Sequence, residues 1–247
     1  MILQISIAAV RPWKLRSAPI AVESPVWVPE TARAPILPLQ RSAIPRDTVA
    51  LARFLLGKLL VRELNGSALV GRIVETEAYL QGDPACHAFR GMTPRNRSLF
   101  LEAGHAYVYL CYGTSYLLNV SGEERGTGAG VLLRALEPLA GIEHMRLGRT
   151  ALRLNDLARG PGRLTAAMQV DLTHDGIDLF SAGCLWIGSD GASVDSIGQS
   201  IRIGLTKGAD ARLRYFIAGS PFLSGPRKLS GPSGRSGLRR RTHAKSA

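Results

Sequence analysis

The chain has 247 residues, of which 45% are hydrophobic and 20% charged, a composition that suits one large or two small globular domains. Its net charge of +12 favours a polyanionic partner, either a nucleic acid or an anionic membrane surface. No apolar run approaches the roughly 18 residues that a membrane helix needs, and no secretory signal is recognisable. We expect no membrane insertion and a cytoplasmic, nucleoid-associated protein if the source is bacterial, with an organellar transit peptide in residues 1–46 as the alternative.

Composition divides the chain into three parts. Residues 1–45 are rich in Pro, Ala and Arg without a clear period, so we expect a poorly ordered N-terminal extension. Residues 225–247 carry seven Lys or Arg side chains and no acid, which predicts a disordered basic tail with salt-sensitive nucleic-acid contacts. Residues 46–224 remain as the folded domain. The three cysteines are an odd number without a C-x-x-C pair, which argues against a disulfide framework or a zinc knuckle.

The folded domain begins with a helix and a β-hairpin. Asp47 is placed to cap a helix whose apolar face extends to residue 55, with Gly57 after its end. Residues 58–63 have the pattern of a strand, and Asn65-Gly66 is a strong signal for a two-residue turn. A second strand over residues 68–80 follows this turn.

Two carboxylates and a phenol occupy alternate positions of the second strand. Alternation places Glu75, Glu77 and Tyr79 on the face that also carries Leu69 and Ile73. Burying carboxylates among apolar side chains is costly unless they have partners or a function. Same-face neighbours lie about 6.5 Å apart, so the two carboxylates cannot share one proton at contact distance. The alternative is an edge strand with a solvated acidic face.

Residues 81–92 form a long loop, and Thr93-Pro94 has the pattern that starts a helix. Arg95 and Arg97 would then lie in the first turn, where the helix dipole disfavours cations. Their presence is explained if an anion such as a phosphate binds there. Two solvated arginines are the alternative.

A hairpin with an aromatic tip follows. Residues 105–111 alternate as a strand with Tyr107 and Tyr109 on one face, and residues 117–120 return. Tyr112 lies at or near the turn, where an exposed aromatic side chain usually has a partner. Stacking on a nucleic-acid base is one such use, and folding back onto the sheet is the alternative.

Residues 131–136 form a buried strand that contains Arg134, which needs a carboxylate partner when buried. Glu75 and Glu77 are the nearest candidates. The remaining pattern predicts helices over residues 138–149, 152–158 and 163–169, and strands over residues 184–188, 200–204 and 213–218. Arg163 follows a Gly-Pro-Gly turn that can approach a phosphate backbone, and Lys207 lies in the loop between the last two strands.

Several of these segments together resemble the 3-methyladenine (alkyladenine) DNA glycosylase family. They occur in order between about residues 46 and 224. The segments are GRIVETEAYL (71–80), TPRNR (93–97), YVYLCYG (107–113), Asn119, VLLRALEP (131–138), GPGRL (160–164) and RYFIAGSP (214–221). The resemblance implies an α+β fold, a single mixed domain with a curved, largely antiparallel sheet flanked by helices and a protruding β-hairpin that intercalates into DNA.

The resemblance also implies an activity. A family member flips an alkylated or deaminated purine out of double-stranded DNA and hydrolyses its N-glycosidic bond with a Glu-activated water, leaving an abasic site. It implies a monofunctional, monomeric enzyme without cofactor or metal. The implied residues are Glu77 and Arg134 for catalysis, Tyr79, His87, Tyr109 and Asn119 for the base pocket, Tyr112 for intercalation, and Arg95, Arg97, Arg163 and Lys207 for the DNA backbone.

The sequence departs from the family pattern at the hairpin tip, where Thr114-Ser115 replaces a bulkier pair, and at Cys86, where a smaller residue is usual. Two other functions stay open. One is a two-carboxylate glycosidase that uses Glu75 and Glu77 on free nucleosides or sugars, which explains neither the basic tail nor Tyr112. The other is a non-catalytic nucleic-acid-binding module, which leaves Glu77 beside Arg134 without a purpose.

Overall fold

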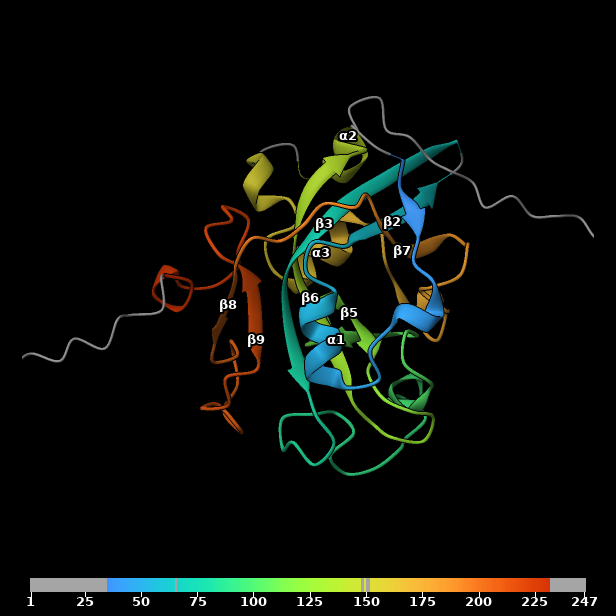
Figure 1. Ribbon diagram of the computed structural model, residues 1–247, viewed down its shortest axis with the longest axis vertical. Coiled ribbons are helices and arrows are strands. Elements are labelled where there is room, and N and C mark those ends of the chain that lie inside the picture. The colour runs from blue at the N-terminus through green and yellow to red at the C-terminus, as the bar shows by residue number, and fades with distance from the viewer. Residues whose placement is uncertain (1–34, 65, 148, 150–151, 232–247) are drawn as a thin grey trace, which may run out of the picture.

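The computed structural model describes residues 35–231, except residues 65, 148, 150 and 151 (Figure 1). The strands are β1 Leu37–Pro38, β2 Leu59–Leu64, β3 Ser67–Tyr79, β4 Ala106–Cys111, β5 Ser115–Ser121, β6 Gly130–Ala140, β7 Leu185–Ser189, β8 Ile197–Ser200 and β9 Arg214–Ile217. The α-helices are α1 Thr48–Phe54, α2 Ile142–Met145 and α3 Pro161–Ala167. Short 3-10 helices are Arg41–Ala43, Arg97–Phe100, Leu154–Asp156, Leu172–His174 and Arg227–Leu229.

One antiparallel sheet organises the domain. Its strand order is β1-β7-β2-β3-β6-β5-β4, and β9 joins β3 with β8 outside it. Along one edge, β3 pairs first with β2 over residues 67–72 and then with β9 over residues 75–77; its other edge pairs with β6. Figure 1 shows β3 as the long central strand that connects the β2 side of the sheet with the β8–β9 pair. The predicted α+β fold with a largely antiparallel sheet is confirmed.

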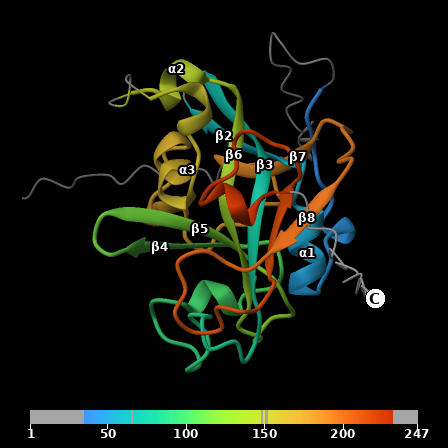
Figure 2. The ribbon, with the colours of Figure 1, turned by 90° about the vertical axis from the view of Figure 1, so that its left-hand side faces the viewer.

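The β4–β5 hairpin projects from the body of the domain (Figure 2). Helix α3 packs beside β5, and Thr165 Oγ1 donates a 2.6 Å hydrogen bond to the carbonyl of Tyr116. The hairpin closes through Tyr112 and Gly113, with φ of 49° and 70°. Two consecutive positive φ values match the twist of the strands, but this conformation costs a non-glycine residue such as Tyr112 energy.

Two opposed β-bulges decide which face the acidic residues occupy. Between Ile73 and Glu75 the partner strand advances by one residue, so Val74 is extra; between Glu75 and Thr76 it advances by two, so Arg134 is extra. A one-residue shift exchanges the faces of the following side chains. Ile73 and Ala78 both pack in the main core, and Thr76 Oγ1 donates to Ala52 of α1 at 2.8 Å.

The acidic positions therefore face away from the main core. The prediction that Glu75, Glu77 and Tyr79 share the face of Leu69 and Ile73 was wrong, because alternation is interrupted at Val74. The bulge on β6 turns Arg134 to the same side as the carboxylates. The same stretch of β3 therefore packs one face in the main core and presents its two carboxylates on the other face.

The helix predicted over residues 138–149 is only partly present, and the α-helix predicted from Thr93-Pro94 does not form. Residues 138–140 belong to β6, where Pro138 lies opposite Gly71 beside a further register shift, a position that tolerates a residue without an N–H. The helix after it is limited to α2. At Thr93-Pro94 the expected cap forms, since Asn96 Oδ1 accepts from the Thr93 amide at 2.6 Å and the Asn96 amide donates to Thr93 Oγ1 at 3.4 Å. Only a turn and the 3-10 helix Arg97–Phe100 follow it, in place of the predicted α-helix.

Other elements agree with the sequence within a few residues. Asp47 Oδ1 caps α1 by accepting from the amide of Ala50 at 2.7 Å, and Leu64 pairs with Ser67 across the predicted two-residue turn, of which Asn65 lies outside the described residues. The strand predicted over residues 200–204 lies earlier in the chain, as β8 Ile197–Ser200. The helices predicted over residues 152–158 and 163–169 are a 3-10 helix and α3.

Regular structure occurs on both sides of residues 46–224. Strand β1 pairs with β7 and buries Ile36, and the segment after Ser224 contains a 3-10 helix. Residues 1–34 and 232–247, which carry most of the predicted extension and tail, lie outside the described residues. Within the described part of the chain, no helix is both long and apolar enough to cross a membrane.

We expect Ile73→Ala to lower the free energy of unfolding by about 2–5 kcal/mol, because Ile73 is fully buried in the main core just before the bulge. Leu172→Ala is the control, since Leu172 is 53% exposed and its truncation should change stability by less than about 0.5 kcal/mol. Urea unfolding of both variants measures the difference. Equal effects would place Ile73 outside the core.

Candidate active site

A cavity of about 610 Å³ lies where four strands meet two loops. Such a volume is in the range of pockets that hold a small molecule. Residues 85–87 with Arg95, and residues 203–205, line it from the two loops, and Tyr112 is also among the lining residues. The four strands each contribute one residue that the family resemblance assigned: Tyr79 from β3, Tyr109 from β4, Asn119 from β5 and Arg134 from β6.

One wall of the cavity is aromatic. His87 and Tyr109 meet edge to face with centroids 4.4 Å apart, and Tyr107 stacks beside Tyr109 at 5.3 Å. The hydroxyl of Tyr107 lies 2.9 Å from His87 Nδ1, which fixes the orientation of the otherwise exposed imidazole. Tyr79 lines the cavity from the end of β3. These rings offer flat apolar faces to a planar ligand.

Glu77 lies behind the cavity wall. Its side chain is fully buried, and the residues that bind it line the cavity. The donors to its carboxylate are the Tyr79 hydroxyl at 2.9 Å, Arg134 Nη1 at 3.2 Å and the amide of Ile203 at 2.8 Å. A carboxylate has about four lone-pair sites, so three donors leave one for a further partner.

A second buried carboxylate holds the other side of Arg134. Glu75 Oε1 accepts from Arg134 Nε at 3.0 Å, from Arg214 Nε at 2.7 Å and from Ser224 Oγ at 2.9 Å. Its Oε2 accepts from the amide of Ser224 at 2.5 Å. Arg134 therefore bridges the two carboxylates. The sequence had predicted that a buried Arg134 needs Glu75 or Glu77 as its partner.

The charge state of the cavity follows from burial. Burial raises the pKa of Tyr79 well above its usual value, and the neighbouring Glu77 raises it further; burial also raises the pKa of Tyr109. Both phenols are therefore neutral. Burial lowers the pKa of Arg134, but Glu77 and Glu75 outweigh it, so the net pKa is raised. Partial desolvation at the cavity wall and, after it, the cation of Arg95 lower the pKa of His87, which favours the neutral imidazole.

Two further predicted residues lie at the cavity with different exposure. Asn119 is buried, and its Nδ2 donates to the carbonyl of Tyr107 at 3.2 Å, so its side-chain oxygen is oriented by the hairpin. Tyr112 is 95% exposed at the hairpin tip. The alternative that Tyr112 folds back onto the sheet is thereby excluded.

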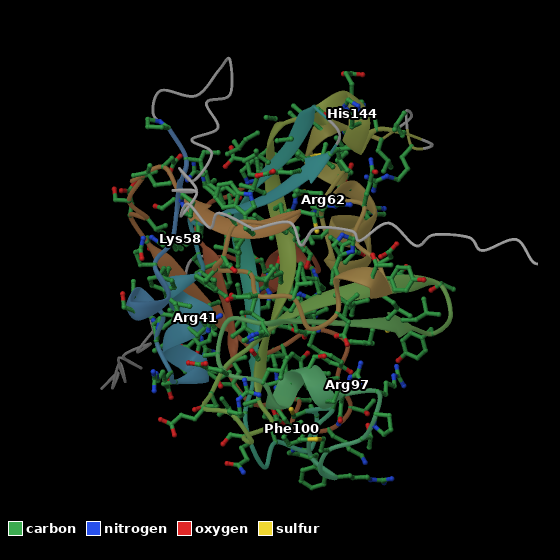
Figure 3. The ribbon with its side chains drawn as sticks, turned by 90° about the vertical axis from the view of Figure 1, so that its right-hand side faces the viewer. Arg41, Lys58, Arg62, Arg97, Phe100 and His144 are labelled. Carbon is green, nitrogen blue, oxygen red and sulfur yellow. The ribbon has the colours of Figure 1, made fainter. Side chains whose placement is uncertain are left out.

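Of the four cations predicted to bind the DNA backbone, only some lie near the cavity. Arg95 lines the cavity with its guanidinium 5.7 Å from the Tyr109 ring centre, and exposed Lys207 lines an adjoining hollow that also includes Arg95. Arg163 begins α3, beside the hairpin, and pairs with Asp156 at 3.5 Å. Arg97 lines a separate hollow, and Figure 3 shows it beneath the hairpin near Phe100, away from Arg41 and Lys58.

Sequence reasoning assigned no role to several residues that build this site. Ile203 supplies a backbone amide, which carries no sequence signal. Arg214 and Ser224 reach Glu75 from segments more than a hundred residues away. Tyr107 is two residues before Tyr109 and so shares its strand face, which was the one sequence signal that could have assigned Tyr107 to the site. Within the described ranges, no three His, Cys, Asp or Glu side chains are placed to hold a metal ion.

We expect Glu75→Gln to lower the free energy of unfolding by about 3–5 kcal/mol, because fully buried Arg214 would lose its only carboxylate partner within the described residues. The control is Glu137→Gln on β6, since Glu137 is partly exposed and lies 3.8 Å from Arg72. That change should cost less than about 1 kcal/mol. Denaturant unfolding at pH 7 measures both, and equal losses would contradict the assigned role of Glu75.

Comparisons with known proteins identify the family of the chain. A family model described as methylpurine-DNA glycosylase (MPG) matches residues 42–221. A Mesorhizobium japonicum protein named "Putative 3-methyladenine DNA glycosylase" is 62% identical over 192 residues, 78% of this chain and 92% of the relative. Relatives of the same name from Paraburkholderia phytofirmans and Koribacter versatilis are 53% identical over 195 residues (79% and 92%) and 46% identical over 209 residues (82% and 100%). This chain belongs to the methylpurine-DNA glycosylase family.

Proposed function

We propose that the protein is a monofunctional, monomeric DNA glycosylase that everts an alkylated or deaminated purine from double-stranded DNA and hydrolyses its N-glycosidic bond, leaving an abasic site. The observation that carries the proposal is the buried Glu77–Arg134 pair directly behind an aromatic cavity of about 610 Å³. A base inside a duplex cannot reach such a cavity, so the nucleotide must leave the stack, at a cost of a few kcal/mol.

The aromatic wall would hold the everted base. A purine that enters the cavity can stack on the faces of Tyr79 and Tyr109, both neutral phenols. A cationic alkylated base gains additional attraction from the negative ring faces. Asn119, fixed by its bond to Tyr107, would crowd the exocyclic amino group of guanine and so disfavour the undamaged base.

Glu77 would act as the general base on one water. Arg134 and the amide of Ile203 orient its carboxylate, and one lone pair is left for the water. Because Glu77 is fully buried in the unbound protein, the contact requires a small movement of the Tyr79 or Arg134 side chain. The water attacks the anomeric carbon as the glycosidic bond breaks, and Glu77 takes its proton. A carboxylate near the anomeric carbon also stabilises the oxocarbenium-like transition state.

Tyr112 would fill the gap that the everted nucleotide leaves. Its ring is almost fully exposed, and its left-handed backbone conformation is strained, which is typical of functional positions. Aromatic stacking is worth about 1–3 kcal/mol per base and offsets part of the eversion cost. Arg95, Arg163 and Lys207 surround the hairpin and the cavity and would contact phosphates; Arg97 lies farther away and is the weakest of the four assignments.

The two other functions fit the geometry less well. A two-carboxylate glycosidase needs both acids free to act on the substrate, but Glu75 already accepts four hydrogen bonds from Arg134, Arg214 and Ser224. A non-catalytic binding module has no use for a fully buried carboxylate behind an aromatic cavity, since such a group is costly to bury. Release of free hypoxanthine from a duplex by the wild-type protein distinguishes the glycosylase from the binding module.

We expect Glu77→Gln to reduce base release from a hypoxanthine-containing duplex by about 10²–10⁴-fold or to below detection, since the general base is lost. DNA binding should persist, and Arg134 keeps Glu75 as a charged partner, so the variant should fold. Glu137→Gln, on the same sheet but outside the cavity, should retain wild-type release. Single-turnover release and gel-shift binding measure these quantities. Wild-type turnover by Glu77→Gln would remove Glu77 from its proposed role.

We expect Tyr112→Ala to weaken binding to a duplex with an abasic site roughly tenfold or more, because the stacking that fills the gap is lost. Binding to undamaged duplex should change little, since phosphate contacts dominate it. Leu110→Ala, a change of another exposed residue on the hairpin, is the control. Equal losses on both duplexes would argue against the wedge.

A further inference from the structure

A buried ion pair lies behind the aromatic wall of the cavity. The guanidinium carbon of Arg202 is 4.6 Å from the centre of the Tyr79 ring. Arg202 is 3% exposed and does not line the cavity, whereas Tyr79 does, so the cation lies on the rear side of the ring. Neither the family resemblance nor the proposed chemistry uses this cation.

Arg202 is held firmly in this place. Both of its terminal nitrogens bind the carboxylate of Asp83, one of them at 3.1 Å. They also donate to the carbonyl of Ala78 at 3.0 Å and to that of Gly208 at 3.2 Å. Asp83 is itself fixed, because its Oδ1 accepts from the amide of Ala85 at 2.9 Å. The pair therefore fixes the guanidinium of Arg202 against Tyr79, with the carboxylate of Asp83 bound to its terminal nitrogens.

A ring between two cations is a poorer partner for either. The negative face of a phenol ring attracts a cation, but a guanidinium on the rear side repels a second cation in front. A base stacked on the front lies about 8 Å from the guanidinium, given a stacking separation of about 3.5 Å. At that distance, and with an effective dielectric constant of about 20, the repulsion between two full charges corresponds to about a 30-fold change in rate. The negative charge of Asp83 cancels part of this repulsion.

We propose that Arg202 and Asp83, acting through Tyr79, set the preference of this site between cationic and neutral bases. Arg202 lowers the advantage of a cationic base, and it stabilises the negative charge that a neutral base acquires as it leaves. Asp83 opposes both effects. Both residues are positioning residues that contact Tyr79 or each other, not the base. The inference rests on the proposed function, since it assigns the lesion preference of that cavity.

The test compares two duplexes that differ only in one lesion, either 7-methylguanine, which is cationic, or hypoxanthine, which is neutral. Single-turnover rate constants give the ratio of cationic to neutral release for each protein. Arg202→Gln should raise this ratio about threefold to tenfold, because the rear cation is lost. Asp83→Asn should lower it by a similar factor, because the cation is no longer offset and the Oδ1 acceptor for Ala85 is kept.

The opposite signs separate electrostatics from a structural role. If the pair only anchors the loop that carries Ile203, both variants weaken the same contact and the ratios shift together or stay constant, which overturns the inference. Arg202→Lys keeps the charge and should keep the ratio near that of the wild type. If thermal unfolding shows that Arg202→Gln does not fold, Asp83→Asn and Arg202→Lys still decide. A wild-type protein that releases neither base contradicts the proposed function itself.

Discussion

Arg134 is shared between two fully buried carboxylates, and the site depends on this interaction. A buried guanidinium without a partner is strongly destabilising, so the fold must deliver acids to it. Glu75 and Glu77 do so from alternate positions of β3, and the bulges at Val74 and Arg134 turn all three groups to one side of the sheet. The opposite side of the same stretch packs α1 into the main core. Core packing and charge placement are therefore set by the same backbone irregularity.

Glu75 and Glu77 suit different roles because they have different hydrogen-bond partners. Glu75 has every oxygen committed to Arg134, Arg214 and Ser224, which suits an anchor. Glu77 is bound by groups that line the cavity and retains one lone pair, which suits proton transfer. Because Tyr79 and Tyr109 stay neutral, the cavity combines uncharged aromatic faces with one oriented carboxylate behind them. That combination suits the proposed everted base with a positive or partly positive sugar.

Local signals in the sequence predicted much of this arrangement. Periodicity and turn residues located β3, the projecting hairpin and the capped helix α1, and the placement of Tyr112 at a turn predicted its exposure. The rule that a buried arginine needs an acid predicted the partners of Arg134. The family resemblance supplied the remaining cavity residues, and the structure brings Tyr79, His87, Tyr109 and Asn119 to one cavity.

Features that depend on tertiary context were missed. Nothing in the local pattern marks Val74 or Arg134 as a bulge, so simple alternation assigned Glu75 and Glu77 to the wrong face. Pro138 normally suggests a helix start, but a register shift in the sheet accommodates it in β6. Arg202 and Ser224 act through contacts across more than a hundred residues of chain, and periodicity carries no information on such pairs. These are the positions where long-range packing overrides local preference.

We propose that Glu77 directs a water to the anomeric carbon of a nucleotide held in the aromatic cavity. The most direct measurement is a crystal structure of the protein with duplex DNA that carries a 2′-fluorinated lesion nucleotide, which resists hydrolysis. We expect the base to stack on Tyr79 and Tyr109, with a water bound to Glu77 and facing the anomeric carbon. A base that stays in the duplex, or a Glu77 carboxylate still covered by Tyr79 and Arg134 with the base in place, would contradict the account.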